Sequence, residues 1–314
     1  MEVRQLKYFV RIVEDGSISR ASLSLHIAQP ALSKQMNQLE SELGVKLLAR
    51  SVRGVVPTEA GLAVFQHAKA LLKQVNATSA IAAQAGGGVA GTVAIGLPWT
   101  ISSMLGLSLL REVRSRLPAV RLEITEGPSS DIAQSLSQGK LDVAVVFGKG
   151  INVALRTKPL VTESLCLVGA AGSLGSRRRR TLEQVSGLPL LLMSRPNGIR
   201  EELERIWAEK GITPNVVADL NAPRLLLDAV QSGLGYGILP SCVFDRTQPT
   251  WKVDAVELRS GAPLRTVCVA TSMLFPISLA AQRVHDIVEM LVYRAVKDGR
   301  WDARTVDGSG AILK

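Results

Sequence analysis

Four polar side chains, Gln29, Ser33, Lys34 and Asn37, lie on one side of a short segment that has helical apolar spacing. A glutamine can bond adenine through two hydrogen bonds, a serine can bond a base or a phosphate, and a lysine can reach guanine acceptors or the backbone. The four residue types therefore fit a helix that contacts the base edges of DNA. The same pattern also fits the solvated polar face of any small helical domain.

The elements around this face favour the first interpretation. An apolar stripe predicts a first helix that ends at Asp15-Gly16, and its members are Leu6, Phe9, Val10 and Val13. Ser17 is a suitable N-cap for a second helix, Pro30 fits the first turn of a third, and Gly44 suits a left-handed C-cap. Two helices joined by a tight turn at 26–28 predict a helix-turn-helix, with residues 29–43 in the major groove.

A two-stranded wing is predicted to follow. Residues 46–50 and 55–57 have the pattern of short strands, and residues 51–54 that of a turn. Arg50 and Arg53 would stand at its tip, where they could reach phosphates or the minor groove. Thr58 is expected to cap a helix running to about Ala85, which is too long and too alanine-rich to be buried by sixty residues, so we expect it to dimerise.

The stretch from Leu6 to Gly61 closely resembles the N-terminal domain of LysR-type transcriptional regulators. The order and spacing of these residues carry the resemblance: Phe9, Gly16-Ser17, Ala21, Gln29-Pro30-Ala31-Leu32-Ser33, Leu39-Glu40, Leu43-Gly44, Leu47, Arg50 and Thr58-Glu59-Ala60-Gly61. It implies DNA contacts from Ser17, Gln29, Pro30, Ser33, Lys34, Asn37, Arg50 and Arg53. The sequence departs from the family pattern at Ala28, where a capping Ser or Thr is usual, at Lys34, where Arg is usual, and at Leu48-Ala49, where Phe-Glu is usual.

Beyond a glycine-rich hinge at 86–91, strand and helix patterns alternate in two series. This alternation predicts parallel sheets covered by helices. The two α/β lobes resemble the effector domain of the same family, which resembles a type-2 periplasmic binding protein, and "GKLDVAVV" and "SGLGYGILP" are the best local matches. We expect a DNA-binding domain at 1–58, a linker helix and hinge at 59–88, and an effector domain at 92–300. Lobe 1 would hold residues 92–161 and 266–300, lobe 2 would hold 162–265, and the tail 301–314 would be disordered.

Ligands of such folds bind where parallel strands end at helix N-termini, which attract anions. Polar residues of three such turns, together with apolar side chains beside them, are the expected effector contacts: Thr100, Ser102, Ser129, Phe147, Met193, Pro196 and Asn197. Thr100 and Ser129 could instead be plain helix caps. We expect a small organic anion, either an aromatic or short-chain carboxylate or a sulfonate.

Composition limits the alternatives. The net charge of +10 allows an acidic partner, but residues 1–60 hold eight Lys and Arg against six Asp and Glu, so pattern rather than bulk charge supports DNA binding there. The arginine run of Ser176–Thr181 is expected to be a solvated loop. Cys166, Cys242 and Cys268 lack metal-ligand spacing, so we expect reduced thiols, no metal and no cofactor. No signal peptide or membrane span is predicted, which indicates a cytoplasmic protein.

Three classes of function fit parts of the sequence. An α/β enzyme with an accessory DNA-binding domain is disfavoured, since no phosphate loop, nucleophile elbow or paired metal ligands are present, and no catalytic residue is assigned. A secreted solute-binding protein would leave residues 1–85 unexplained. The favoured function is a ligand-responsive transcriptional regulator, and the resemblance implies a homodimer or homotetramer, a partly palindromic operator and RNA polymerase as a partner. Within the family the chain looks nearest to regulators of nitrogen assimilation or of aromatic acid and sulfonate degradation.

Overall fold

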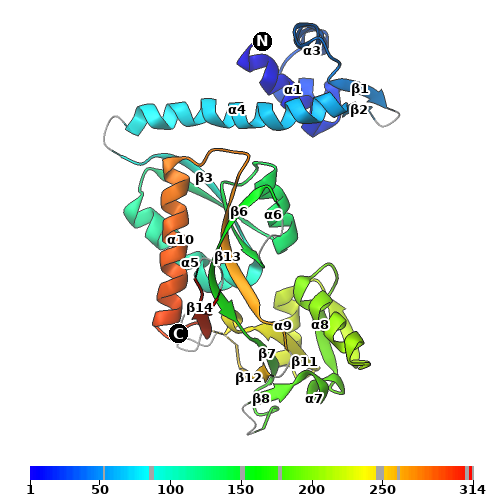
Figure 1. The fold of residues 1–314 in the computed structure, drawn as a ribbon, viewed down its shortest axis with the longest axis vertical. Coiled ribbons are helices and arrows are strands. Elements are labelled where there is room, and N and C mark those ends of the chain that lie inside the picture. The colour runs from blue at the N-terminus through cyan, green and yellow to red at the C-terminus, as the bar shows by residue number, and fades with distance from the viewer. Residues whose placement is uncertain are drawn as a thin grey trace. The chain divides into compact units, whose positions relative to one another are not determined.

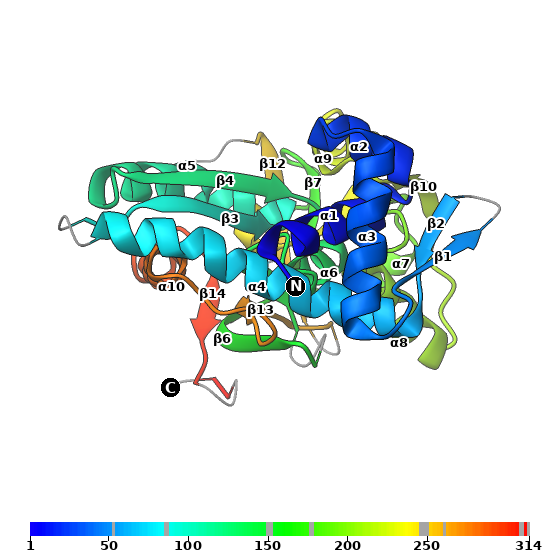
Figure 2. The same ribbon diagram turned by 90° about the horizontal axis from the view of Figure 1, so that it is seen from above.

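Local capping signals define the N-terminal helices. The computed structural model describes residues 1–51, 54–84, 88–148, 153–175, 179–244, 251–259, 262–307 and 311–312. Its first three helices are α1 (Val3–Asp15), α2 (Ile18–Leu25) and α3 (Gln29–Leu43), followed by the wing strands β1 (Leu48–Ser51) and β2 (Gly54–Pro57) and the long helix α4 (Glu59–Gln84). Figure 2 shows α3 and the wing in one view. Gly16 and Gly44 end α1 and α3 in left-handed conformations, and proline stands in the first turn of α3, as predicted.

The chain forms two compact units, which are described separately. The N-terminal unit comprises Met1–Gly91 with Leu274–Ser278, and the effector unit comprises Thr92–Met273 with Leu279–Lys314. The core of the N-terminal unit is built from α1, α2, α3, the start of the wing and the N-terminal half of α4, with Phe9, Ile12 and Leu39 fully enclosed. Ile12 rather than the predicted Val13 completes the buried stripe of α1, and Val13 is half-buried.

Lobe 1 of the effector unit is a six-stranded sheet flanked by helices. Its strands lie in the order β14-β6-β13-β5-β3-β4. Its elements are β3 (Gly91–Leu97), α5 (Trp99–Arg116), β4 (Val120–Glu126), α6 (Ser129–Ser137), β5 (Val143–Phe147), β6 (Leu155–Glu163), β13 (Arg265–Ser272), α10 (Leu279–Lys297) and β14 (Ala303–Thr305). Helices α5 and α10 pack side by side (Figure 1), with Arg294 of α10 bonded to Glu112 of α5 at 2.7 Å. Residues of α6 pack against Ala144 and Val146 on β5.

Lobe 2 is a second six-stranded sheet, in the order β10-β9-β11-β7-β12-β8. Its elements are β7 (Leu165–Ala170), β8 (Arg179–Thr181), α7 (Leu182–Ser186), β9 (Leu190–Met193), α8 (Gly198–Glu209), β10 (Val216–Leu220), α9 (Pro223–Gln231), β11 (Tyr236–Pro240), the short 3₁₀ helix η1 (Ser241–Val243) and β12 (Val253–Arg259). Trp207 of α8 is buried in its core. Chain segments pass between the lobes at Glu163–Leu165 and in the stretch between β12 and β13.

The prediction of parallel sheets is wrong in one respect. Each sheet is mixed, because β13 runs antiparallel to β5 and β6, and β7 runs antiparallel to β11 and β12. Strands β6 and β12 were missed. They carry the chain into and out of lobe 2, and neither is followed by the helix that marks a βαβ unit.

Two further expectations are corrected. Arg179–Thr181 is a strand paired with β12 rather than a solvated loop, and the half-buried Arg180 donates from Nη2 to the Leu174 carbonyl at 3.0 Å; Ser176 to Arg178 lie outside the described residues. The segment after Lys297 is not a disordered tail where it is described. Trp301 is buried, and Ala303–Thr305 pair with β6 as a sixth strand.

Within the described residues, no helix combines the length and apolarity that crossing a membrane requires.

Candidate nucleic-acid interface and ligand site

The outward face of α3 carries the predicted DNA contacts. Gln29, Ser33 and Asn37 follow one another at four-residue intervals, and at about 100° per residue this spacing keeps them on one side of the helix. Gln29, Lys34 and Asn37 are exposed, and Ser33 is half-buried. Pro30 is exposed in the first turn, and Ala28 at the N-cap makes no side-chain cap bond. A row of amide and hydroxyl groups on one helix face suits hydrogen bonding to base edges.

Gln29 is oriented by a residue that the sequence did not single out. The Ser19 hydroxyl of α2 donates to Gln29 Oε1 at 2.9 Å, which turns the Gln29 NH₂ group away from α2. Ser17 itself caps α2, because its hydroxyl accepts from the Arg20 N–H. Helix α2 therefore orients the side-chain amide of Gln29 in addition to packing against α3.

The wing is anchored to α3 by a buried carboxylate. Glu40 of α3 accepts hydrogen bonds from the N–H groups of Leu47 at 2.9 Å and Leu48 at 3.1 Å, and from Lys46 Nζ at 2.6 Å. Gly16 accepts from the Val55 N–H at 2.9 Å. These bonds set the position of β1 and β2 relative to α3. Arg50 lies in β1, but its side chain and the whole of Arg53 lie outside the described residues.

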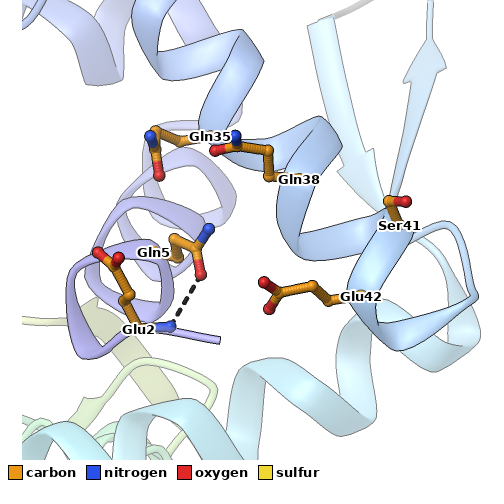
Figure 3. Close-up of a pocket in the computed structure, with 6 residues that line it drawn as sticks. All are labelled: Glu2, Gln5, Gln35, Gln38, Ser41 and Glu42. Atoms are coloured by element: carbon orange, nitrogen blue, oxygen red, sulfur yellow. Dashed lines mark hydrogen bonds between the residues drawn. The ribbon is translucent and has the colours of Figure 1, made fainter.

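A polar hollow lies on another side of α3. It has a volume of about 450 Å³ and is lined by residues of α1 and α3: Glu2, Gln5, Gln35, Gln38, Ser41 and Glu42. Figure 3 shows that the carboxylate of Glu42 on α3 points toward Glu2 and Gln5. Its two carboxylates disfavour phosphate contacts, so the hollow is separate from the DNA-facing side.

Three of the predicted effector residues meet in lobe 1. The link between them is Arg265, whose guanidinium lies 3.7 Å from the centre of the Phe147 ring and donates to Thr100 Oγ1 at 3.2 Å. Ser129 joins the group because its hydroxyl accepts from the Phe147 N–H at 3.0 Å. Thr100 lies in the first turn of α5, Ser129 begins α6 and Phe147 ends β5, so the three come from neighbouring strand ends.

The helices that begin at this group have no side-chain caps. Pro98 precedes α5 and Pro128 precedes α6, and neither helix has a side-chain cap bond. Their first backbone N–H groups are therefore open to an anion. The hydroxyls of Thr100 and Ser129 each accept a bond within this group, and a hydroxyl that accepts a bond can still donate its proton.

The other predicted effector residues make contacts of their own. The Ser102 hydroxyl lies beside Gly106, one turn further along α5, within 3.4 Å of an ideal Cβ at that position. In lobe 2, Asn197 caps α8 by accepting from the N–H groups of Ile199 and Arg200, both at 3.1 Å. Met193 is half-buried at the end of β9, and Pro196 is exposed. In the part of the chain that the structure describes, no hydrogen bond joins these lobe 2 residues to Thr100, Ser129 or Phe147.

Arg265 is a candidate site residue that the sequence analysis did not single out. It is bonded to Glu163, which stands 102 positions earlier in the chain and is fully buried. Cys242 lies 3.2 Å from Arg265 Nη2, and burial, with the neighbouring Glu163 carboxylate, raises the pKa of the Cys242 thiol. This cysteine therefore stays a protonated thiol. Among the described residues, no group of three or more His, Cys, Asp and Glu side chains is placed to hold a metal ion.

Comparison with known proteins agrees with this architecture. Residues 3–62 match the bacterial regulatory helix-turn-helix protein, lysR family, and residues 86–291 match the LysR substrate binding domain. The chain belongs to the LysR family. It is a DNA-binding transcriptional regulator and not an enzyme, and the predicted fold of a winged helix-turn-helix with two α/β lobes is confirmed.

Relatives of this LysR regulator match along nearly the whole chain. The nitrogen assimilation regulatory protein nac of Klebsiella aerogenes is 34% identical over 96% of this chain and 98% of its own length. A full-length OxyR variant from Pseudomonas aeruginosa has a TM-score of 0.71 at 24% identity, covering 92% of this chain and 95% of that one. Full-length CbnR in complex with its target DNA has a TM-score of 0.61 at 22% identity, covering 93% and 100%. The two structures support the fold.

The orientation of Gln29 in this LysR regulator leads to a test on DNA. Gln29→Ala and Ser33→Ala are each expected to weaken a matched operator by about 1–3 kcal/mol and to relax base preference at one position. Ser19→Ala should relax preference at the Gln29 position alone, because it frees the amide without removing it. Selection of bound sequences from random DNA measures all three. A Ser19→Ala protein with unchanged base preference would show that the Ser19 bond does not contribute.

The Glu40 anchor predicts a pH dependence. Burial disfavours its charged form, but the hydrogen bonds from Lys46, Leu47 and Leu48 outweigh burial and hold the pKa of Glu40 below its ordinary 4.5. A lowered carboxyl pKa stabilises the folded state above the unfolded value, and the stabilisation is lost as pH falls through the folded value. Glu40→Gln should therefore lower the unfolding temperature of the N-terminal unit at pH 7, and the difference from wild type should shrink as pH falls below about 4.5. A difference that stays constant down to about pH 3 would contradict this role.

Proposed function

We infer that this LysR regulator responds to a small organic anion that binds between its two lobes and changes how the protein sits on its operator. The observation that carries the proposal is the group formed by Thr100, Ser129, Phe147 and Arg265 at the uncapped starts of α5 and α6. Hydroxyl protons, open helix N–H groups and a guanidinium all favour a negative charge. Met193 and Pro196 would supply contacts from lobe 2.

The ligand class follows from the same residues. The half-buried Phe147 ring offers an apolar surface next to these donors. This combination favours an aromatic or short-chain carboxylate or a sulfonate over a sugar, whose hydroxyls would need partners around the whole ring. Lobe closure on the ligand would shift the population of DNA-bound arrangements through differential affinity for the two states.

The long helix α4 supports assembly as a homodimer. Leu62 is 51% exposed and Val75 is 44% exposed on it, so large apolar side chains remain for a second copy to cover. Pairing through α4 would set two recognition helices at a fixed spacing on a partly palindromic operator. We also propose that two such dimers form a homotetramer. The protein would act in the cytoplasm and contact RNA polymerase. The nac relative is named for nitrogen assimilation, so nitrogen-source genes are the first place to seek operators.

A thermal-shift screen tests the ligand proposal. Small aromatic and aliphatic carboxylates and sulfonates are compared with neutral analogues such as benzamide, because ligand binding to the folded state raises its unfolding temperature. We expect acids to shift the transition and to alter operator affinity, and neutral analogues to do neither. Acids that leave both quantities unchanged would contradict the proposal.

Thr100→Val keeps the side-chain volume and removes the hydroxyl. We expect it to weaken binding of the most effective acid by about 1–3 kcal/mol, the cost of a desolvated group that loses its partner. Operator binding without ligand should be unchanged, because Thr100 lies in the effector unit. Isothermal titration calorimetry provides the measurement. If wild type and Thr100→Val bind the acid with equal affinity, Thr100 does not contact the ligand and has only a structural role in the first turn of α5.

A further inference from the structure

A buried carboxylate lies where the chain passes between the lobes. Glu163, the last residue of β6, is 1% exposed and accepts hydrogen bonds from both lobes. From lobe 2, the Ser241 hydroxyl donates to Glu163 Oε2 at 3.0 Å, and the Cys242 N–H donates to the same oxygen at 2.9 Å. From the C-terminal segment, the Trp301 indole N–H donates to the same oxygen at 2.9 Å. Oε2 thus accepts from two N–H groups and from the Ser241 hydroxyl, which shares its single proton with the Asp302 carbonyl at 2.7 Å.

Among the described residues, Arg265 is the hydrogen-bond donor to the other oxygen of Glu163. Arg265 Nε donates to Oε1 at 2.9 Å, and Nη2 donates to the same atom and to Thr100. Arg265 as a whole is only 9% exposed. Within the described part of the chain, its Nη1 atom donates no hydrogen bond, yet this atom is not fully buried. This terminal nitrogen is the one position on the guanidinium from which a further hydrogen bond can be made.

We propose that Arg265 is the residue that binds the effector's acid group, and that Glu163 is a built-in counter-anion that sets how tightly acids bind. The inference rests on the proposed function, because it concerns the same site. The acid would bond to Arg265 Nη1 and to the Thr100 hydroxyl, with its body against the Phe147 ring. Thr100 would then be a secondary contact that Arg265 orients.

The counter-anion role follows from charge. The Arg265–Glu163 pair is neutral, so an incoming carboxylate leaves the group with one net negative charge close to Glu163. Like charges in a poorly solvated place repel strongly, which limits affinity and selects acids with one charge over acids with two. The N–H groups of Cys242 and Trp301 donate to Oε2 and not to the oxygen that Arg265 bonds, so Glu163 keeps these two bonds when the guanidinium turns toward the ligand. These donors belong to lobe 2 and to the C-terminal segment. A movement of Arg265 therefore affects, through Glu163, the contacts where the two lobes join.

Removal of the counter-charge provides the test. Full-length wild type, Glu163→Gln and Arg265→Gln are titrated with benzoate and with benzamide, its neutral analogue, by isothermal titration calorimetry. Glu163→Gln should bind benzoate at least about tenfold more tightly than wild type, because Arg265 then has no other carboxylate beside it. Arg265→Gln should lose benzoate binding, and benzamide should bind all three proteins alike. A folded Glu163→Gln protein with equal or weaker benzoate affinity would overturn the proposal.

The outcomes separate this inference from the proposed function. One outcome is that benzoate leaves operator binding of wild type unchanged while Glu163→Gln binds benzoate through Arg265. That result would support the acid-binding role of Arg265 and contradict the proposal of an aromatic acid as effector. If benzoate alters operator binding of wild type but has one affinity for all three proteins, the proposed function stands and this inference falls. Should Glu163→Gln not fold, Glu163→Asp keeps the charge but withdraws it from Arg265. Its benzoate affinity should then exceed that of wild type, and an equal or lower affinity would overturn the proposal.

Discussion

Replacement of Trp301 with alanine is expected to destabilise the effector unit by about 3–5 kcal/mol. The indole is 1% exposed, so its removal leaves a large cavity beside β6 and α10. It also removes the N–H that bonds Glu163 at 2.9 Å, and a buried carboxylate that loses a donor destabilises the fold further. Urea unfolding followed by circular dichroism measures the change.

Trp301→Phe is the matched control for this prediction. It keeps much of the ring volume and removes the N–H, so we expect a smaller loss of about 1–3 kcal/mol. A loss below about 1 kcal/mol for Trp301→Ala would show that the segment after α10 does not pack against lobe 1.

The second large effect is expected at Gly61, in the first turn of α4. A Cβ on Gly61 would stand 2.0 Å from the carbonyl oxygen of Leu47, a backbone atom that cannot rotate away. Gly61→Ala must therefore move the start of the wing, and we expect it to destabilise the N-terminal unit by about 3 kcal/mol. Since Leu47 is also bonded to Glu40, the shift should reach α3 and weaken operator binding.

Gly88→Ala serves as the control for Gly61. Gly88 belongs to the same unit, and an added Cβ there would meet no atom within 4 Å. Thermal unfolding and operator titration of both variants give the comparison. Gly61→Ala with the unfolding temperature and operator affinity of Gly88→Ala would refute the close approach of α4 to the wing.

The N-terminal unit was predictable because its signals are local. Ser17 caps α2, Pro30 stands in the first turn of α3, and Gly44 ends that helix, and each effect acts within a few residues. The wing was predictable from the strand and turn patterns of residues 46–57. The Ser19–Gln29 bond was missed because two exposed residues ten positions apart give no periodic signal.

The effector unit was predictable only in part. Helices α5, α6, α8 and α9 follow strand patterns and could be found from the alternation. The antiparallel strands β6 and β12 could not, because their pairing partners lie far away in the chain. The same reason hides Arg265, which looks like an ordinary charge at a strand start until the fold brings Glu163 and Thr100 beside it.

The most direct test of ligand control is a footprint of the operator, recovered by selection from random DNA, with and without an acid identified by thermal shift. We expect two related half-sites, and we expect saturation with the acid to change the operator affinity or the extent of protection. Arg265→Gln should keep the acid-free footprint and lose the change. An identical footprint and affinity with the acid fully bound to wild type would contradict the claim that a ligand between the lobes controls DNA binding.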